Sequence, residues 1–137
     1  MSFLLDTKVL SETRRRAADA NVLAWLGNAD PGELYVSVLS IGEIKNGIEA
    51  RRQSDARAAA ALDHWLRGLE TLFADRLVAI DVDIAETWGE LAARTPLPVI
   101  DALIAATAKA RGLTVVSRNV RDIARAGVDV VNPWQGA

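Results

Sequence analysis

Five residues of this chain have types and positions that suit chemistry at an acidic site: Asp6, Glu43, Asp101, Asn119 and Asp122. Carboxylates that cluster raise one another's pKa, so such a group persists when it encloses a cation. Oxygen ligands without histidine or cysteine favour Mg²⁺ or Mn²⁺ over Zn²⁺. A Mg²⁺ ion held by few carboxylates keeps its waters and can activate one for attack on a phosphate. The residue types therefore predict metal-dependent hydrolysis at phosphorus.

Asp6 and Asp101 have the most unusual surroundings of this set. Asp6 follows the apolar run 3–5, which indicates a buried strand that ends at the acid, where ligands bind in open parallel sheets. Asp101 is the only charge in the apolar segment 99–108, which predicts a buried helix. The helix dipole favours an acid at that end by only about 0.3–1 kcal/mol. This is small against the cost of burying an unpaired carboxylate, so we expect Asp101 to have a partner.

Glu43 lies on a predicted helix, next to an isoleucine stripe rather than in it. The same helix contains Gly42 and Gly47, although a glycine inside a helix costs about 1 kcal/mol relative to alanine. The two glycines indicate that something approaches the helix backbone closely.

Asn119 and Asp122 lie just beyond the predicted strand 114–116, at the same edge of the sheet as Asp6. Arg118 and Arg121 share this turn, and guanidinium groups are well suited to hold the phosphates of a nucleic acid. We therefore expect these two arginines to hold a phosphate backbone.

Each acid also has a structural interpretation, since acids with a perturbed pKa occur in structural networks as well. Asp6 and Asp101 could cap helices, Glu43 could be a solvated residue, and Asp122 could be a surface acid. Their common placement at strand ends and on a buried helix favours a functional site.

The elements that position these residues alternate between short apolar strands and longer helices. The strands are predicted at 3–5, 34–37, 77–80, 114–116 and 128–131. The helices are predicted at 7–12, 21–28, 40–52, 54–73, 84–94, 99–111 and 120–126. Alternation of this kind is typical of an α/β fold with three layers, α/β/α, around a mostly parallel sheet of about five strands. The 137 residues fit a single domain, 1–137.

The composition sets limits on the function. The chain has no cysteine, which excludes thiol nucleophiles and disulfides and is compatible with a reducing cytosol. No apolar run approaches the roughly 20 residues that span a membrane, and no secretory signal is evident, so we expect a cytoplasmic protein. The net charge of −2 argues against a surface coated in positive charge, but it allows a local basic rim around an acidic pocket.

Four segments of the chain resemble PIN-domain ribonucleases of the VapC/FitB toxin type. They are LLDTKVLSE at 4–12, SVLSIGEIKNGIEA at 37–50, PVIDALIAATAKARGLTVVSRNVRD at 98–122 and VDVVNPW at 128–134. The resemblance implies Mg²⁺- or Mn²⁺-dependent cleavage of RNA and a homodimer. It also implies a small antitoxin that covers the acidic pocket, in a larger hetero-oligomer.

The same resemblance assigns roles to the acids. Asp6 and Asp101 are the implied main metal ligands, and Glu43 is a ligand either directly or through water. The fourth acidic position of the family falls on Asn119 or Asp122. The family commonly has Asn or Ser two residues after the first acid, where this chain has Lys8, which places a cation beside the pocket.

Two rival classes would use Asp81, which closes the predicted strand 77–80. A phosphorylated receiver domain needs an acidic pair after the first strand and a lysine after a late strand, and neither is present. An aspartyl phosphatase would use Asp81-Val82-Asp83, but the small residues that should follow are missing. A DNA-binding regulator is disfavoured because no basic helix-turn-helix pattern is visible.

Overall fold

The short apolar runs of the sequence form one five-stranded sheet in the order β3-β2-β1-β4-β5. The computed structural model describes residues 1–136 of the chain. The strands are β1 (Phe3–Leu5), β2 (Leu34–Ser37), β3 (Leu77–Val78), β4 (Thr114–Val116) and β5 (Val130–Val131). All four pairings are parallel, and β1 lies between β2 and β4. The predicted α/β class is confirmed, and the sheet is parallel throughout.

Alternate residues of the central strands point to opposite faces of the sheet, as the pleat requires. Leu5, Val36 and Val116 belong to one buried cluster. Leu4 and Val115 belong to a second cluster. Both faces of the sheet are therefore covered, which explains why its strands are continuous apolar runs without polar residues between them.

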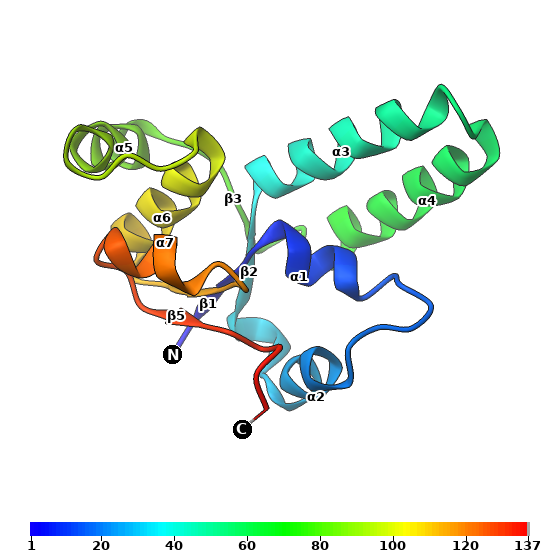
Figure 1. Cartoon of the computed structure of the whole chain (residues 1–137), viewed down its shortest axis with the longest axis horizontal. Coiled ribbons are helices and arrows are strands. Elements are labelled where there is room, and N and C mark those ends of the chain that lie inside the picture. The colour runs from blue at the N-terminus through cyan, green and yellow to red at the C-terminus, as the bar shows by residue number, and fades with distance from the viewer. Residues whose placement is uncertain (137) are drawn as a thin grey trace.

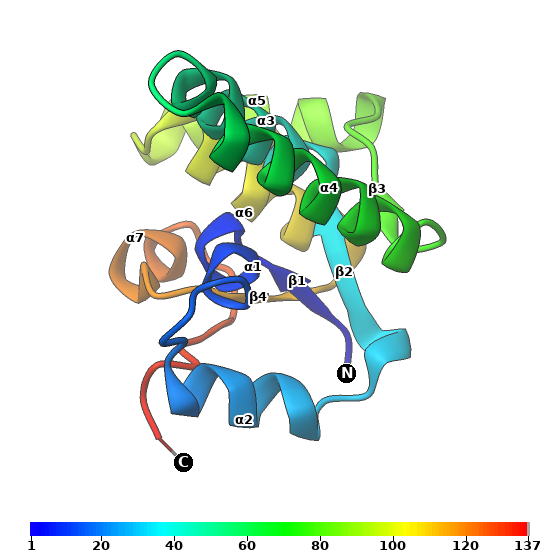
Figure 2. The ribbon, with the colours of Figure 1, turned by 90° about the vertical axis from the view of Figure 1, so that its right-hand side faces the viewer.

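The first cluster is closed by the helices that follow β1 and β2. These are α1 (Thr7–Glu12), α2 (Ala20–Asn28), α3 (Val38–Arg52) and α4 (Ala56–Leu72), with a short 3₁₀ turn η1 (Pro31–Glu33) before β2. Figure 1 shows α3 and α4 as a long helical hairpin that extends away from the sheet. In Figure 2, α2 lies on the far side of α1 from this hairpin, near the C-terminal segment.

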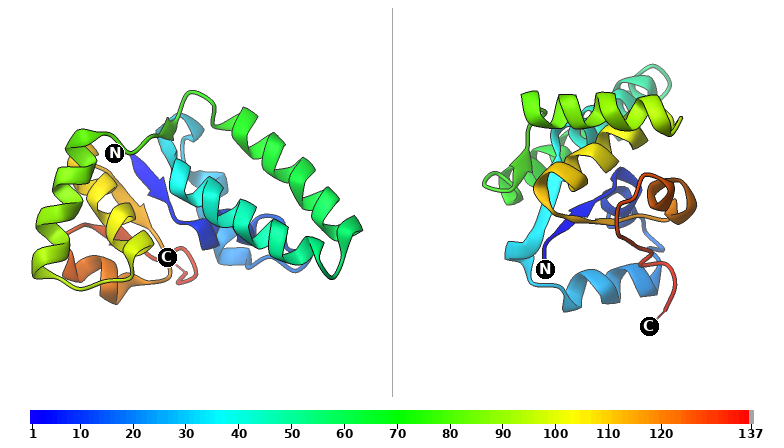
Figure 3. Two further views of the ribbon diagram at one scale, coloured as in Figure 1. Left: turned by 90° about the horizontal axis from the view of Figure 1, so that it is seen from above. Right: turned by 90° about the vertical axis from the view of Figure 1, so that its left-hand side faces the viewer.

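The second cluster is closed by α5 (Val82–Arg94), α6 (Val99–Arg111) and α7 (Val120–Arg125). Viewed from above, the pair α5 and α6 and the pair α3 and α4 lie on opposite sides of the sheet (Figure 3). Gly112 ends α6 with a φ of 66°, in the left-handed region that glycine adopts without strain. The three-layer arrangement predicted from the sequence is confirmed.

Two strands are shorter than predicted. The strand predicted at 77–80 ends at Val78, because Asp81 accepts a hydrogen bond from the amide of Ile84 and begins α5. The strand predicted at 128–131 begins at Val130, because its short partner β4 pairs only through Val115 and Val116. No helix within residues 1–136 is both long and apolar enough to span a membrane.

Glu12 is a buried acid that holds the connection between α1 and α2. Glu12 is only 5% exposed. Its carboxylate accepts hydrogen bonds from the amide of Asp19 at 2.8 Å and from Nη1 of Arg15 at 3.1 Å. The amide of Asp19 is the main cause that lowers the pKa of Glu12 below its usual 4.5, and Arg15 adds to it. The ionised side chain therefore stabilises this connection.

We expect Glu12→Gln to destabilise the protein at neutral pH and to have less effect in acid. A lowered folded-state pKa gives stability that is present above pH 4.5 and is lost as the pH falls towards the folded-state value. Urea midpoints measured from pH 3 to pH 7 should show the two proteins converging at the acid end. The exposed Glu86→Gln on α5 is the control and should follow the wild-type curve. A constant gap between Glu12→Gln and wild type at every pH would contradict this assignment.

Candidate active site

The candidate site lies where the order of the strands reverses. The chain adds β2 and β3 on one side of β1, and then β4 and β5 on the other. Ligands of open α/β sheets bind at such a switch point, beyond the carboxyl ends of the strands. The residues at this place line a cavity of about 280 Å³, and they are Asp6, Lys8, Asp101, Arg118 and Asn119. We call it the acid cavity.

Asp6 directly follows the carboxyl end of β1 and is held there by hydrogen bonds to the end of β4 and to the start of α1. Its amide donates to the carbonyl of Val116 at 3.0 Å, which extends the β1–β4 pairing by one residue. Its Oδ1 accepts the amide of Thr7 at 2.8 Å, and its Oδ2 accepts the hydroxyl of Ser117 at 2.8 Å. Asp6 thus begins α1, as its structural interpretation requires, and also directs its second oxygen towards β4.

Asp101 is half-buried in the first turn of α6. It is not the cap of that helix, since Pro98 occupies this position and no side chain there bonds the free amides. Its nearest polar contact is Nδ2 of Asn119, which donates to Oδ2 at 3.4 Å. This is long for a hydrogen bond. The partner expected for this acid is therefore a weakly held amide, and no lysine or arginine in residues 1–136 lies within 4.0 Å of it.

The electrostatics of the acid cavity disfavour a charge on Asp101. Burial is the largest cause of its raised pKa, and the negative charges of Asp6, Glu43 and Asp122 add to it in that order. Lys8 acts in the opposite direction but is the smallest of these influences. The lysine that departs from the family pattern therefore lies beside the acids without neutralising them.

Glu43 lies on α3 and is connected to the site by a hydrogen bond from Thr7. The hydroxyl of Thr7 donates to Oε1 of Glu43 at 2.6 Å and lies 2.9 Å from the hydroxyl of Ser40, which is fully buried. Because the amide of Thr7 binds Asp6, this one residue links two of the predicted acids. Glu43 itself does not line the acid cavity, and its residue is exposed.

The glycines beside Glu43 have open space where a side chain would project. A Cβ atom built on Gly42 or Gly47 would meet nothing within 4 Å. The close approach to the α3 backbone that these glycines indicate is therefore not made by any side chain or neighbouring segment within residues 1–136. Space next to the helix is open at both positions.

The turn after β4 divides its residues between the site and the surface. Asn119 and Arg118 line the acid cavity. Asp122 lies one turn further on α7, where it influences Asp101 through its charge and lies 3.8 Å from Arg125. Arg121 is exposed and does not line the acid cavity. The structure thus brings one of the two predicted arginines to the acids.

Two side chains that the sequence does not assign to the site, Ser117 and Trp134, support site residues. Ser117 donates to Asp6 and accepts the amide of Asn119 at 3.0 Å, so it fixes both. The indole of Trp134 lies beneath Arg118, with 4.3 Å between the guanidinium carbon and the ring centroid. Nδ2 of Asn21 on α2 donates to the backbone carbonyl of Trp134 at 3.0 Å, which holds Trp134 in place. The only sequence signal for the contact between Ser117 and Asp6 is that this serine directly follows a buried strand.

The donor chemistry of the acid cavity fits a hard divalent cation. Asp6 and Asp101 contribute carboxylate oxygens from different elements, and the half-buried Asp101 has only the long amide contact and the weak influence of Lys8 to offset its charge. A cation between them would remove the repulsion that raises the pKa of Asp101. Within residues 1–136, no group of three or more acidic, histidine or cysteine side chains is placed so that it could hold a metal ion, so the fit rests on the two carboxylates of Asp6 and Asp101.

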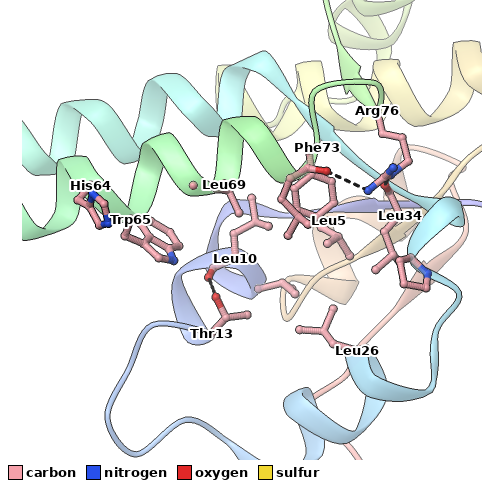
Figure 4. Close-up of a pocket in the computed structure, with 14 residues that line it drawn as sticks. Leu5, Leu10, Thr13, Leu26, Leu34, His64, Trp65, Leu69, Phe73 and Arg76 are labelled. Atoms are coloured by element: carbon pink, nitrogen blue, oxygen red, sulfur yellow. Dashed lines mark hydrogen bonds between the residues drawn. The ribbon is translucent and has the colours of Figure 1, made fainter.

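Two other features lie outside this site. An apolar groove of about 600 Å³ lies among α1, α2 and α4, and Leu5, Leu10, Leu69 and Phe73 are among its lining residues (Figure 4). Asp81, the residue on which the receiver and phosphatase interpretations depend, caps α5 and is paired with Arg111. Its carboxylate is thus committed to structure, and it lines a different cavity from Asp6.

The parallel sheet, with acids at its switch point, defines the class of the protein as a PIN domain. The family described as PIN domain matches residues 3–128, and this chain belongs to it. It is 34% identical to the VapC ribonuclease Y4jK of Sinorhizobium fredii, over 98% of this chain and 99% of that protein. The crystal structure of FitAcB from Neisseria gonorrhoeae superposes with a TM-score of 0.90 at 29% identity, covering 97% of this chain and 99% of that one. A toxin–antitoxin complex from Klebsiella pneumoniae is similar at 27% identity and a TM-score of 0.66, over 99% of this chain and 100% of that one.

Proposed function

We propose that this protein is a Mg²⁺- or Mn²⁺-dependent endoribonuclease and the toxin of a toxin–antitoxin pair. The observation that carries the proposal is the convergence of Asp6 and Asp101, from β1 and α6, on one cavity where burial and repulsion raise the pKa of Asp101. Repelling acids at a strand switch point are costly for the fold and useful for holding a cation. The similarity to a VapC ribonuclease supports RNA as the substrate, which implies action in the cytoplasm.

Within this proposal, Asp6 and Asp101 are the residues that hold the metal, and Glu43 contributes directly or through water. When bound, the ion supplies an activated water and charge neutralisation at the phosphate oxygens. Ser117 and Asn119 keep the two aspartates oriented, and Thr7 does the same for Glu43. Asn119 takes the fourth position of the family pattern beside Asp101, and Asp122 adds negative charge from α7.

Arg118 is the proposed phosphate contact at the acid cavity. It lines the cavity beside Asp6 and Asp101, and its guanidinium rests on the ring of Trp134. A cation over an aromatic face is stabilised and loses less freedom when it binds a ligand. Arg121 stays a candidate for contacts further along the RNA, since it lies on the adjacent exposed face of α7.

We expect Trp134→Leu to raise KM for RNA about two- to fivefold with little change in kcat. This range corresponds to the roughly 0.5–1 kcal/mol of a cation–π contact at an exposed site. The effect should vanish in the Arg118→Ala background, because Trp134 acts through that arginine. Trp25→Leu is the matched control, since Trp25 is also half-buried but packs edge-on against Phe3, with 5.0 Å between ring centroids. Additive effects of the Trp134 and Arg118 changes would argue against this coupling.

The proposed partner is a small antitoxin that covers the acid cavity with a basic side chain. The repulsion among Asp6, Asp101 and Glu43 favours such a cation, and a solved structure of this fold is itself a toxin–antitoxin complex. A homodimer and a larger hetero-oligomer with the antitoxin complete the proposal. Copurification with the product of an adjacent reading frame, followed by a thermal melt of both species, tests the partner.

The proposed activity is tested by incubating the purified protein with total RNA and Mn²⁺, with and without EDTA, and sequencing the new RNA ends. Discrete ends that require the metal support it, and RNA that remains intact in every reaction contradicts it. A parallel incubation with a small-molecule phosphodonor, read out by protein mass, separates it from the receiver and phosphatase classes. A gain in mass of one phosphoryl group, lost in Asp81→Asn, would favour those classes instead.

A further inference from the structure

A second cavity lies beside Glu43, outside the acid cavity. It is a groove of about 230 Å³ among α1, α3 and α4, and Thr7, Arg14, Glu43, Gly47, Arg51 and Trp65 are among its lining residues. We call it the α1–α3 groove. Thr7 and Glu43 both line it, and the amide of Thr7 donates to Asp6 of the acid cavity. A chain molecule that occupied the acid cavity could therefore continue into this groove past Thr7.

The α1–α3 groove has two exposed guanidinium groups in its walls. No carboxylate in residues 1–136 lies within 4.0 Å of Arg14, whose guanidinium carbon lies 5.8 Å from the ring centroid of Trp65. Arg51 lies 3.8 Å from Asp55, and both side chains are about half exposed, so water and salt screen this pair strongly. Two arginines and one acid, Glu43, line the groove, which therefore presents a net positive charge beside the acid cavity.

Gly47 leaves part of the groove wall without a side chain. It is exposed on α3, lines the groove, and has open space where a side chain would project. Glycine inside a helix costs about 1 kcal/mol relative to alanine, and no contact within residues 1–136 accounts for that cost at this position. A ligand that lies against the helix backbone would account for it.

Trp65 separates this groove from the apolar groove. Its half-buried ring lines both cavities, and Figure 4 shows it on the apolar side, next to His64 on α4. On the side of the α1–α3 groove the same residue carries Arg14 over its ring. An apolar peptide segment would suit the first cavity, and a polyanion suits the second.

We propose that the α1–α3 groove binds the part of the RNA strand next to the cut, with Arg14 and Arg51 contacting phosphates and Gly47 leaving room for the backbone. This inference rests on the proposed ribonuclease function. The positive charge selects the occupant: a phosphodiester backbone is attracted by both arginines, whereas a basic segment of the kind that would cover the acid cavity is repelled by them. The RNA path therefore runs from Arg118 across the acids to Arg14.

The length of the RNA is the variable that tests the proposal. A short oligonucleotide around a mapped cut site and a longer one extended on both sides are compared by kcat/KM. We expect wild type to prefer the longer RNA, and Arg14→Gln and Arg51→Gln each to reduce that preference about three- to tenfold. Each change should also lower the dependence of log KM on log salt concentration by about one unit, as the loss of one phosphate contact requires.

Gly47→Leu blocks the groove without removing a charge, and Gly42→Leu is its matched control. Both glycines are exposed on α3 with open space around them, but Gly42 does not line the groove. Both changes should raise thermal stability slightly, because leucine favours a helix over glycine. Only Gly47→Leu should abolish the preference for the longer RNA.

The outcomes separate this proposal from the function on which it rests. Wild type that cuts neither RNA contradicts the ribonuclease proposal itself. Wild type that cuts both RNAs equally well, or a Gly47→Leu variant that keeps the full preference for length, overturns the groove assignment alone. A Gly47→Leu variant that keeps this preference but resists inhibition by the antitoxin would show that the groove receives the protein partner, which also overturns it.

Discussion

Asp101→Asn will lower kcat/KM for RNA cleavage by at least about 10²–10³-fold, the range seen when one group of a preorganised charged site is removed. The half-buried carboxylate has no cation within 4.0 Å in residues 1–136 and only a 3.4 Å amide contact, so its negative charge serves no structural bond of ordinary length. Asparagine keeps the shape of the side chain and removes the charge. Loss of activity then follows from loss of metal affinity and not from a change in fold.

The same substitution should leave the metal-free protein at least as stable as wild type. A raised folded-state pKa means that the charged form is disfavoured in the folded state, so at neutral pH Asp101 lowers stability. In EDTA, wild type should gain stability as the pH falls towards that pKa, and Asp101→Asn should show less of this gain.

The control for this substitution is Asp83→Asn on α5, where the carboxylate is 72% exposed. Single-turnover cleavage and thermal melts of the three proteins give both readouts. Cleavage by Asp101→Asn at the wild-type rate would remove this residue from the site. An inactive variant that melts well below wild type in EDTA would show instead that Asp101 is structural.

Mn²⁺ at about 100 times its Kd should raise the melting temperature of wild type by about 10 °C. Binding to the folded state alone contributes about 2.7 kcal/mol at that concentration. For a domain of this size, about 3–4 °C accompany each kcal/mol. Asp6→Asn and Asp101→Asn should lose most of this shift, since each removes an oxygen ligand from the acid cavity.

This measurement also separates the roles of Asn119 and Asp122. Asn119 lines the acid cavity, whereas Asp122 acts on Asp101 through its charge from α7. Asn119→Ala should therefore cost more of the Mn²⁺ shift than Asp122→Asn. The absence of any shift in wild type across millimolar Mn²⁺ would contradict a metal site between Asp6 and Asp101.

The sequence predicts the sheet and the placement of Asp6 well, because both follow from one strong pattern. Short apolar runs that end in polar residues can be buried only as parallel strands with their carboxyl ends at a common edge. Asp101 was identifiable for the same reason, since a lone charge in an apolar helix has few structural explanations.

The supporting contacts could not be predicted, because they join residues that are remote in the sequence. Ser117 and Asp6 are 111 positions apart, and Asn21 and Trp134 are 113 positions apart. A serine or an asparagine is common in loops and turns, so neither carries a local signal of its partner. Gly47 is the opposite case: the sequence indicates a close approach to its backbone, but no approaching group lies within residues 1–136.

Because β1 has only three residues, the chain should not tolerate insertions at this strand. Because its register with β4 sets Leu4 and Leu5 in different cores, an inserted codon before Asp6 would exchange these two side chains and turn the acid away from Ser117. The tip between α3 and α4, at residues 53–55, is exposed and far from these contacts. A reporter peptide or an epitope belongs at that tip, and a library of random insertions should recover active clones there and none across residues 3–6.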